Sequence, residues 1–285
     1  MFGRRKQFVI ELDGAIYRCS GSTIEQIADI DDIDGDIRFI SDCQGAISRT
    51  QTTEAPCKYA EVMIRKQLQE AGEFDEPISV ITHWKKKKAA NATDIFFSAL
   101  PARLYYQYLD RTKTREDCTI FLPLYAVILS ALRNQRDSAP VAVAFQHDRF
   151  ADLVIGTRKR IYYANRCVAY DATREQMASL WQTVASDIEE SEKENHITIG
   201  KLLIITWLDS QVDPELPPGL AEKVVFMEEE SVFFDGRERH ISFLKACEET
   251  PASFSISGSP EKIALYSRKF LPFLNGVALL LCLLF

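Results

Sequence analysis

Residues 141–166, VAVAFQHDRFADLVIGTRKRIYYANR, decide the fold of this chain. Two polar turns separate three short β-rich runs, which are residues 141–145, 153–156 and 160–165. Short runs bounded by turn residues predict strands, so we expect a three-stranded antiparallel meander. The sequence on either side of the meander shows to which larger fold it belongs.

Downstream of the meander, the pattern changes to alternating helix and strand. Residues 173–194 carry apolar side chains at helical spacing and predict a long amphipathic helix. Residues 201–207 form a near-continuous apolar run, which is typical of a strand that is covered on both faces. A short helix near Leu220 and a strand over residues 224–227 follow. We therefore expect a lobe of class α/β over residues 137–260.

The same order of strands and helices is predicted in the first part of the chain. Apolar runs on both sides of Asp13-Gly14 predict a hairpin with a tight turn, and the meander continues into a strand over residues 36–41. The remaining predicted elements are helices over residues 60–71, from Pro101 and over 124–132, and strands over 78–82, 94–100 and 119–122. The polar break at residues 134–140 then ends a first α/β lobe, residues 1–136.

A meander followed by helices and strands, occurring twice, resembles the plan of the actin, sugar kinase and Hsp70 superfamily, a duplicated ribonuclease H-like fold. Three stretches are similar to the PilM and GspL proteins, the actin-like cytoplasmic components of type IV pilus and type II secretion machines. These stretches are residues 94–132, 141–166 and 201–226, the last with the turn Pro218-Gly219-Leu220. The resemblance implies a two-lobed actin-like scaffold.

The resemblance also implies where ATP would bind, since superfamily members that bind it use two hairpin turns and a third, glycine-rich loop. The corresponding residues here are Asp13 and Gly14, then His147 and Asp148, then Trp207 and Asp209. Ile16 and Tyr17 crowd the first turn, the second has no glycine, and Trp207 takes the room that a purine needs. We expect a pseudo-ATPase with no cofactor and no catalytic residue. The alternative is a nucleotide-binding ATPase or kinase of the same superfamily.

The last fifteen residues, 271–285, contain no charge and follow Arg268 and Lys269. Cations on the upstream side of an apolar run predict membrane insertion with the body of the chain in the cytoplasm, hence a single-pass protein of the inner membrane. The apolar residues expected in the bilayer include Leu271, Phe273, Leu279, Leu280, Leu281, Leu283, Leu284 and Phe285.

As a helix, this run is about 22 Å long, shorter than the roughly 30 Å hydrocarbon core. Either native residues follow Phe285 or residues 261–285 form a short tail anchor. A third interpretation is a soluble α/β domain whose last helix completes the core.

Composition excludes several other functions. The chain has 285 residues, is 46% hydrophobic and carries a net charge of −7, which indicates a folded body and gives no support for nucleic-acid binding. The seven cysteines form no C-x-x-C pair and are expected to be reduced thiols. No metal site is expected, because the four histidines are isolated and the acidic turn at residues 31–36 lacks the glutamate of a calcium loop.

The resemblance implies docking as the function of this chain. The implied partners are PilN- or GspM-like inner-membrane proteins and the assembly ATPase, and a homodimer is an alternative to the monomer. Candidate surfaces are residues 227–234, MEEESVFF, which an edge strand with a charged turn explains equally well, and the lysines at 85–88. The lysines are either a solvated hairpin loop or a contact for anionic headgroups of the inner leaflet.

Overall fold

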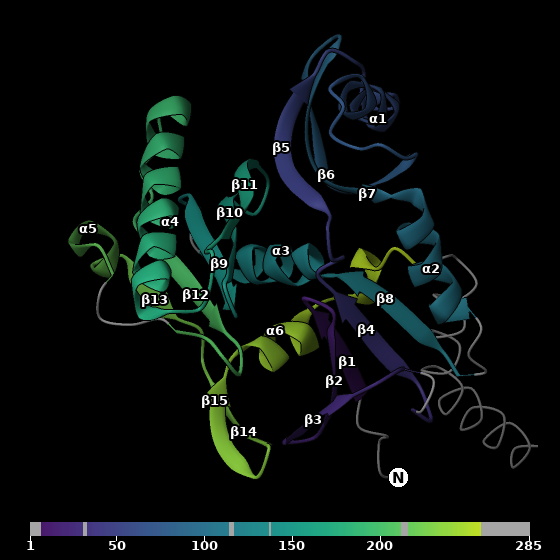
Figure 1. Ribbon diagram of the computed structural model, residues 1–285. Coiled ribbons are helices and arrows are strands. Elements are labelled where there is room, and N and C mark those ends of the chain that lie inside the picture. The colour runs from purple at the N-terminus through teal and green to yellow at the C-terminus, as the bar shows by residue number, and fades with distance from the viewer. Residues whose placement is uncertain (1–6, 31–32, 114–116, 137, 212–215, 258–285) are drawn as a thin grey trace, which may run out of the picture.

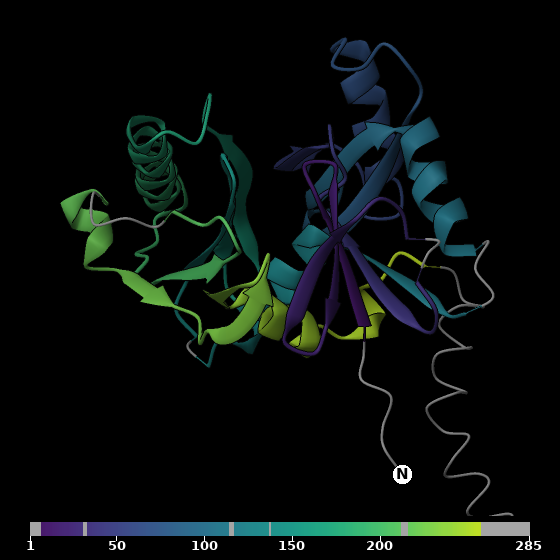
Figure 2. The ribbon, with the colours of Figure 1, turned by 60° about the horizontal axis from the view of Figure 1, so that its bottom comes forward.

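The computed structural model describes residues 7–30, 33–113, 117–136, 138–211 and 216–257 (Figure 1). Two large sheets stand side by side, and a smaller sheet extends from the first of them (Figures 1 and 2). The strands of the second large sheet are β9 (Val141–His147), β10 (Phe150–Gly156), β11 (Ile161–Val168), β12 (Leu202–Thr206) and β13 (Val224–Phe226). The meander predicted from residues 141–166 is thus confirmed.

The second sheet has the order β11-β10-β9-β12-β13. Its meander is antiparallel, whereas β12 pairs in parallel with both β9 and β13. Helix α4 (Arg174–Asn195) covers one face of this sheet and buries the predicted stripe that includes Leu180 and Trp181. Helix α5 (Pro218–Ala221) buries Leu220 against the same face.

The first large sheet contains the same arrangement, in the order β3-β2-β1-β4-β8. Strands β1, β2 and β3 form the antiparallel meander, and β4 pairs in parallel with β1 and β8. The bounds are β1 (Gln7–Leu12), β2 (Ala15–Ser20), β3 (Thr23–Ile27), β4 (Ile37–Ser41) and β8 (Thr119–Pro123). Identical strand order and direction in two sheets of one chain indicate a duplicated unit.

A small subdomain lies between β4 and β8 in the sequence. Its sheet has the order β5-β7-β6, made of β5 (Ile47–Thr53), β6 (Ile78–Ala89) and β7 (Ala92–Pro101). Helix α1 (Ala60–Glu70) covers one face, and α2 (Ala102–Lys113) leads back to β8. The lysines at 85–88 therefore lie in β6 rather than in a loop, because this strand continues its pairing with β7 up to Ala89.

Two helices connect the lobes. Helix α3 (Leu124–Asn134) and helix α6 (Phe243–Glu249) pack on one another between the large sheets (Figure 1). Nine consecutive residues of α3, from Leu124 to Leu132, are buried. One apolar cluster runs through both helices and includes Leu12 and Ile120 of the first lobe and Val143 of the second. The junction between the lobes is therefore a packed core.

Chain order and spatial order differ in the last part of the second lobe. Strands β14 (Glu230–Phe234) and β15 (Arg237–Ile241) form a hairpin that joins the first sheet, where Phe233 and Phe234 pair in parallel with Thr23 and Ile24 of β3. The segment up to Ser257, including the 3₁₀ helix η1 (Ala252–Phe254), then lies against β8. Residues 230–241 and 252–257, expected in the second lobe, thus belong to the first, while α6 lies between the two.

Candidate functional site

The structure brings the three predicted loop positions together at the junction of the lobes. Asp13 and Gly14 form the β1–β2 turn with φ of 47° and 79°, and Asp148, in the β9–β10 turn, has φ of 42°. Trp207 directly follows β12, and its ring lies 5.5 Å from that of Tyr17. Burial raises the pKa of Tyr17, and the nearby carboxylates of Asp148 and Asp209 raise it further.

Aromatic side chains fill the space between these loops. Trp207 is only 3% exposed and makes an edge contact with Phe243 of α6 at 5.6 Å. The contacts continue through stacked rings at centroid distances of 4.2 Å for Phe243–Phe145, 5.1 Å for Phe145–His147 and 5.3 Å for His147–Phe150. Trp207, at the position that the resemblance assigns to a purine, is thus part of the core.

Side-chain hydrogen bonds reach the backbone of each hairpin turn, at an N–H group in the first turn and at a carbonyl in the second. The Asp13 N–H donates to Asp42 Oδ2 at 3.2 Å, and the Gln44 side chain lies over Gly14, 3.4 Å from where a Cβ would stand. In the second turn, the Gln146 side-chain amide donates to the carbonyl of Asp148 at 2.7 Å. Side chains of the protein thus occupy both turns.

A buried ion cluster joins the lobes beside the turns. Arg166 of β11 donates two N–H groups to Asp152, at 2.8 and 3.1 Å, and a third to Asp42 Oδ2 of the first lobe, at 3.1 Å. Tyr125 of α3 donates its hydroxyl to Asp152 at 2.7 Å, and His147 Nε2 lies 3.5 Å from the same carboxylate. Asp152 is fully buried and Asp42 is 5% exposed. Asp42, Asp152, Arg166, Tyr125 and His147 are called the clamp below.

Electrostatics within the clamp favour a fixed ion pair. Burial raises the pKa of Asp152, but the Arg166 guanidinium and the nearby His147 ring together outweigh burial, so the pKa lies well below its usual range. At Asp42, by contrast, burial outweighs the single contact with Arg166, and the pKa is raised. Arg166 is thus committed to two carboxylates, while Arg149, in the second turn, donates to the carbonyl of Tyr170 at 3.2 Å.

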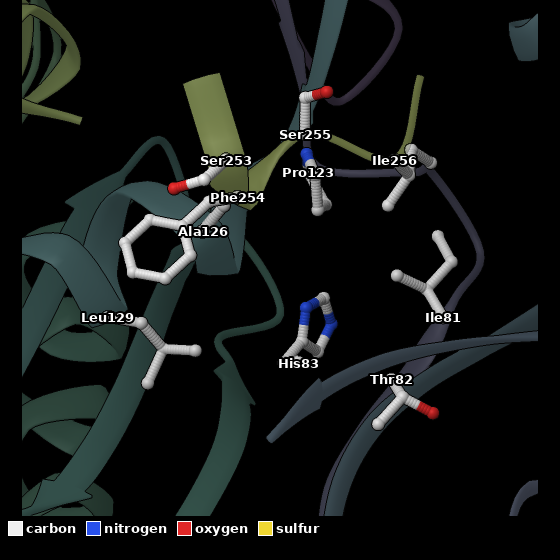
Figure 3. Close-up of a pocket in the computed structure, with 10 residues that line it drawn as sticks. All are labelled: Ile81, Thr82, His83, Pro123, Ala126, Leu129, Ser253, Phe254, Ser255 and Ile256. Atoms are coloured by element: carbon white, nitrogen blue, oxygen red, sulfur yellow. The ribbon is translucent and has the colours of Figure 1, made fainter. Parts of the chain in front are cut away.

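A cavity of about 190 Å³ lies on the other side of Tyr125, between the small sheet and α3. It is lined by Ile81, Thr82 and His83 of β6, by Pro123, Ala126 and Leu129, and by residues 253–256. Figure 3 shows the His83 ring extending into this cavity between Leu129 and Ile81. Six of the ten lining residues are apolar, and Thr82, His83, Ser253 and Ser255 add polar groups to the lining.

His83 is neutral near pH 7, because burial lowers its pKa to about 3. Its Nε2 lies 2.7 Å from Ser98 Oγ, which in turn lies 2.6 Å from Ser48 Oγ. The ring also packs 4.8 Å from Phe96 and 5.5 Å from Tyr125, the clamp residue. Part of the ring surface nevertheless stays accessible from the cavity.

The remaining predictions concern the membrane residues, a metal site and the surface at residues 227–234. The expected membrane residues, Arg268, Lys269 and residues 271–285, lie outside the described part of the chain. Within that part, no helix is both long and apolar enough to cross a bilayer, and no group of three His, Cys, Asp or Glu side chains could hold a metal ion. Of the candidate surface at residues 227–234, Val232 is 1% exposed and Phe233 is 51% exposed.

The sequence analysis missed the clamp. One signal was present, since Asp152 is a lone carboxylate inside the apolar strand FADLVIG and pairs directly with Arg166 across the meander. A charge inside a buried strand needs a partner. Asp42 and Tyr125 gave no such signal, because they approach Arg166 only when the lobes pack.

No protein-family model matches the sequence, and no curated protein matches it. Among solved structures, a chain of a PilM-PilN type IV pilus biogenesis complex is similar, with a TM-score of 0.56 at 8% identity over 79% of this chain and 89% of that chain. The cytoplasmic domain of EpsL, an inner-membrane component of the type II secretion system of Vibrio cholerae, reaches 0.44 at 12% identity, over 86% and 93%.

A Bacteroides thetaiotaomicron protein with an actin-like ATPase fold and unknown function also scores 0.44, at 10% identity, over 79% and 91%. A TM-score of 0.44 is too low to support a conclusion about this chain. The repeated strand order of the two large sheets and the match to the PilM-PilN complex agree with one another. Together they show that this chain has a two-lobed, PilM-like actin fold.

Proposed function

We propose that this protein is a scaffold without ATPase activity. In this proposal it links cytoplasmic and inner-membrane components of a type IV pilus or type II secretion machine, and residues 261–285 attach it to the inner membrane. The observation that carries the proposal is the packed junction, where Trp207 contacts Phe243 at the position that the resemblance assigns to a purine and Asp42 accepts the Asp13 N–H of the first turn. A lobe junction that is packed with side chains leaves little room for a nucleotide, which supports docking rather than ATP turnover as the function.

The cavity beside His83 supports docking of a partner segment. At about 190 Å³ it is smaller than the roughly 300 Å³ of the smallest pockets for drug-sized ligands, yet large enough for one or two apolar side chains. A buried anchor side chain in such a pocket supplies much of the energy of a peptide interface. We propose that the cavity receives an apolar residue from the N-terminal segment of a PilN- or GspM-like inner-membrane protein.

A thermal-shift titration with ATP and Mg²⁺ tests the absence of nucleotide binding. We expect no saturable rise in melting temperature, because a ligand stabilises a fold only if it binds the folded state. A saturable rise would instead support the alternative, an ATPase or kinase of the same fold. Fractionation tests the attachment, since a chain found entirely in the supernatant without detergent is not anchored.

Peptide titration tests the docking site. Synthetic N-terminal segments of the inner-membrane proteins encoded beside this chain would be labelled and titrated with the full chain. Ser253, exposed at the cavity, permits a rim substitution, Ser253→Trp, and Ser186→Trp on the exposed face of α4 is the matched control. We expect the first variant to weaken binding at least about tenfold and the control to bind normally. Equal binding by both variants would remove the cavity from the proposal.

A further inference from the structure

Basic side chains from both lobes meet at a second surface, away from the cavity. The four lysines at 85–88 are all exposed along β6. Lys86 pairs with Asp94 of β7, so both side chains lie on the same face of the small sheet. Lys88 lies on that face too, with its Nζ 3.4 Å from Asp94 Oδ1 and 3.1 Å from Thr52 Oγ1. This face is the one opposite α1.

The second lobe supplies the other cations. The turn between β10 and β11 exposes Arg158, Lys159 and Arg160 in succession. Arg160 Nη2 reaches across to Asp94 Oδ2 at 4.0 Å, while β11 runs beside β5 (Figure 1). Asp94 thus contacts one cation from each lobe. Lys86, Lys88, Arg158, Lys159 and Arg160 are called the basic junction surface below.

Protection of an exposed sheet edge explains the lysines of β6 but not the cations of the second lobe. Lysines on an exposed edge strand discourage pairing with another sheet, which accounts for those of β6. It does not account for three more cations on a turn of the other lobe that closes on the same carboxylate. Five like charges repel one another, and one Asp94 balances only part of them in a chain whose net charge is −7.

We propose that the basic junction surface binds an acidic polypeptide segment of a partner protein. Such a segment is narrow and extended, so its carboxylates can contact cations of both lobes on either side of Asp94. A flat bilayer would reach the tip of the β6–β7 hairpin more readily than the turn beside β5. This interaction goes beyond the proposed docking at the cavity and does not depend on it, because the two surfaces share no residue.

A binding experiment with the full chain and a fluorescein-labelled oligoglutamate peptide tests the proposal. The variant Lys86→Gln/Arg160→Gln removes one cation from each lobe. The matched control, Lys66→Gln/Lys193→Gln, removes two exposed lysines from α1 and α4. By fluorescence anisotropy at low salt, we expect Kd to rise about five- to tenfold for the first pair and to stay unchanged for the control. Equal Kd values for the two pairs would overturn the proposal.

Asp94→Asn gives the opposite expectation. Removal of the carboxylate that competes for these cations should tighten peptide binding several-fold, whereas Asp75→Asn, at an exposed aspartate elsewhere, should not. Weaker or unchanged binding by Asp94→Asn would contradict the proposal. Vesicles of phosphatidylcholine with phosphatidylglycerol form the last arm. If the full chain binds these vesicles through Lys86 and Arg160 but does not bind the peptide, the surface belongs to a membrane and the proposal is wrong.

Discussion

Replacing Arg166 with methionine tests the physical account of the clamp. Methionine keeps much of the side-chain volume but removes all three N–H contacts to Asp152 and Asp42. Asp152 is fully buried and keeps only Tyr125 and His147 as partners. Loss of one partner from a buried ion pair costs about 3–5 kcal/mol, so we expect a fall of that size in the free energy of unfolding at pH 7.

The size of the loss should depend on pH. Without Arg166, burial would raise the pKa of Asp152 above its unfolded value. A carboxyl group with a raised folded pKa favours the folded state at low pH and loses that contribution as pH rises through the folded pKa. The wild-type pair keeps its contribution above the unfolded pKa of about 4. The difference between the two proteins should therefore shrink by up to about 1.4 kcal/mol per unit as pH falls from 7 towards 5.

Urea unfolding at pH 7 and pH 5, followed by circular dichroism, measures both effects. Arg158→Met, at an exposed arginine of the same lobe, is the control and should change stability by less than about 0.5 kcal/mol. The double variant with Asp152→Asn should recover part of the loss, since the uncompensated charge is gone. A loss below about 1 kcal/mol at pH 7, or one that does not vary with pH, would refute this account of the clamp.

Two further predictions concern single positions. His83 stays neutral in the fold with a pKa of about 3, while the unfolded chain protonates it near 6.5, so stability should fall as pH drops from 6.5 towards 3. Between pH 6.5 and 5 the fall should be about 1–2 kcal/mol, because the cavity leaves the ring partly accessible, and His83→Gln should abolish this component in urea titrations. A Cβ on Gly156 would stand 2.5 Å from the backbone oxygen of Arg160, so Gly156→Ala should lower stability by about 1–3 kcal/mol. Gly200→Ala, with no atom within 4 Å, should not; equal melting temperatures for these two variants would contradict the geometry.

The fold could be predicted where local pattern and tertiary structure agree. The turn at Asp13-Gly14 lies between two runs that alternate or cluster apolar residues, and β1 and β2 form as expected. Asp235-Gly236 is the same turn signal, with φ of 48° and 71°, yet the hairpin of β14 and β15 was not predicted. Its strands carry mostly exposed residues, and their partner, β3, lies about two hundred residues earlier in the chain.

The candidate site also has one part that follows from local sequence and another that depends on tertiary packing. The crowding of the three loop positions followed from the size of Trp207 and from the missing glycines, which are local properties, and the absence of a bound nucleotide stays a prediction. The clamp depends on contacts between Asp42, Tyr125 and Arg166, which are far apart in sequence and meet only through the packing of the lobes. Only part of the basic junction surface could be predicted. The lysines of β6 stand out in the sequence, but nothing in the sequence indicates that Arg160 of the other lobe lies beside them.

The path of the chain has a mechanical consequence. It leaves the first lobe after α3, builds the second, and returns through β14 to complete the sheet that it began. A fragment that stopped at the lobe boundary would leave β3 as an open edge and would lack α6. The second lobe is thus inserted into the first rather than joined to it in series. Tension applied to one lobe is therefore carried into the other along two separate covalent connections, and the lobes separate only when the packing of α3 and α6 and the clamp are broken.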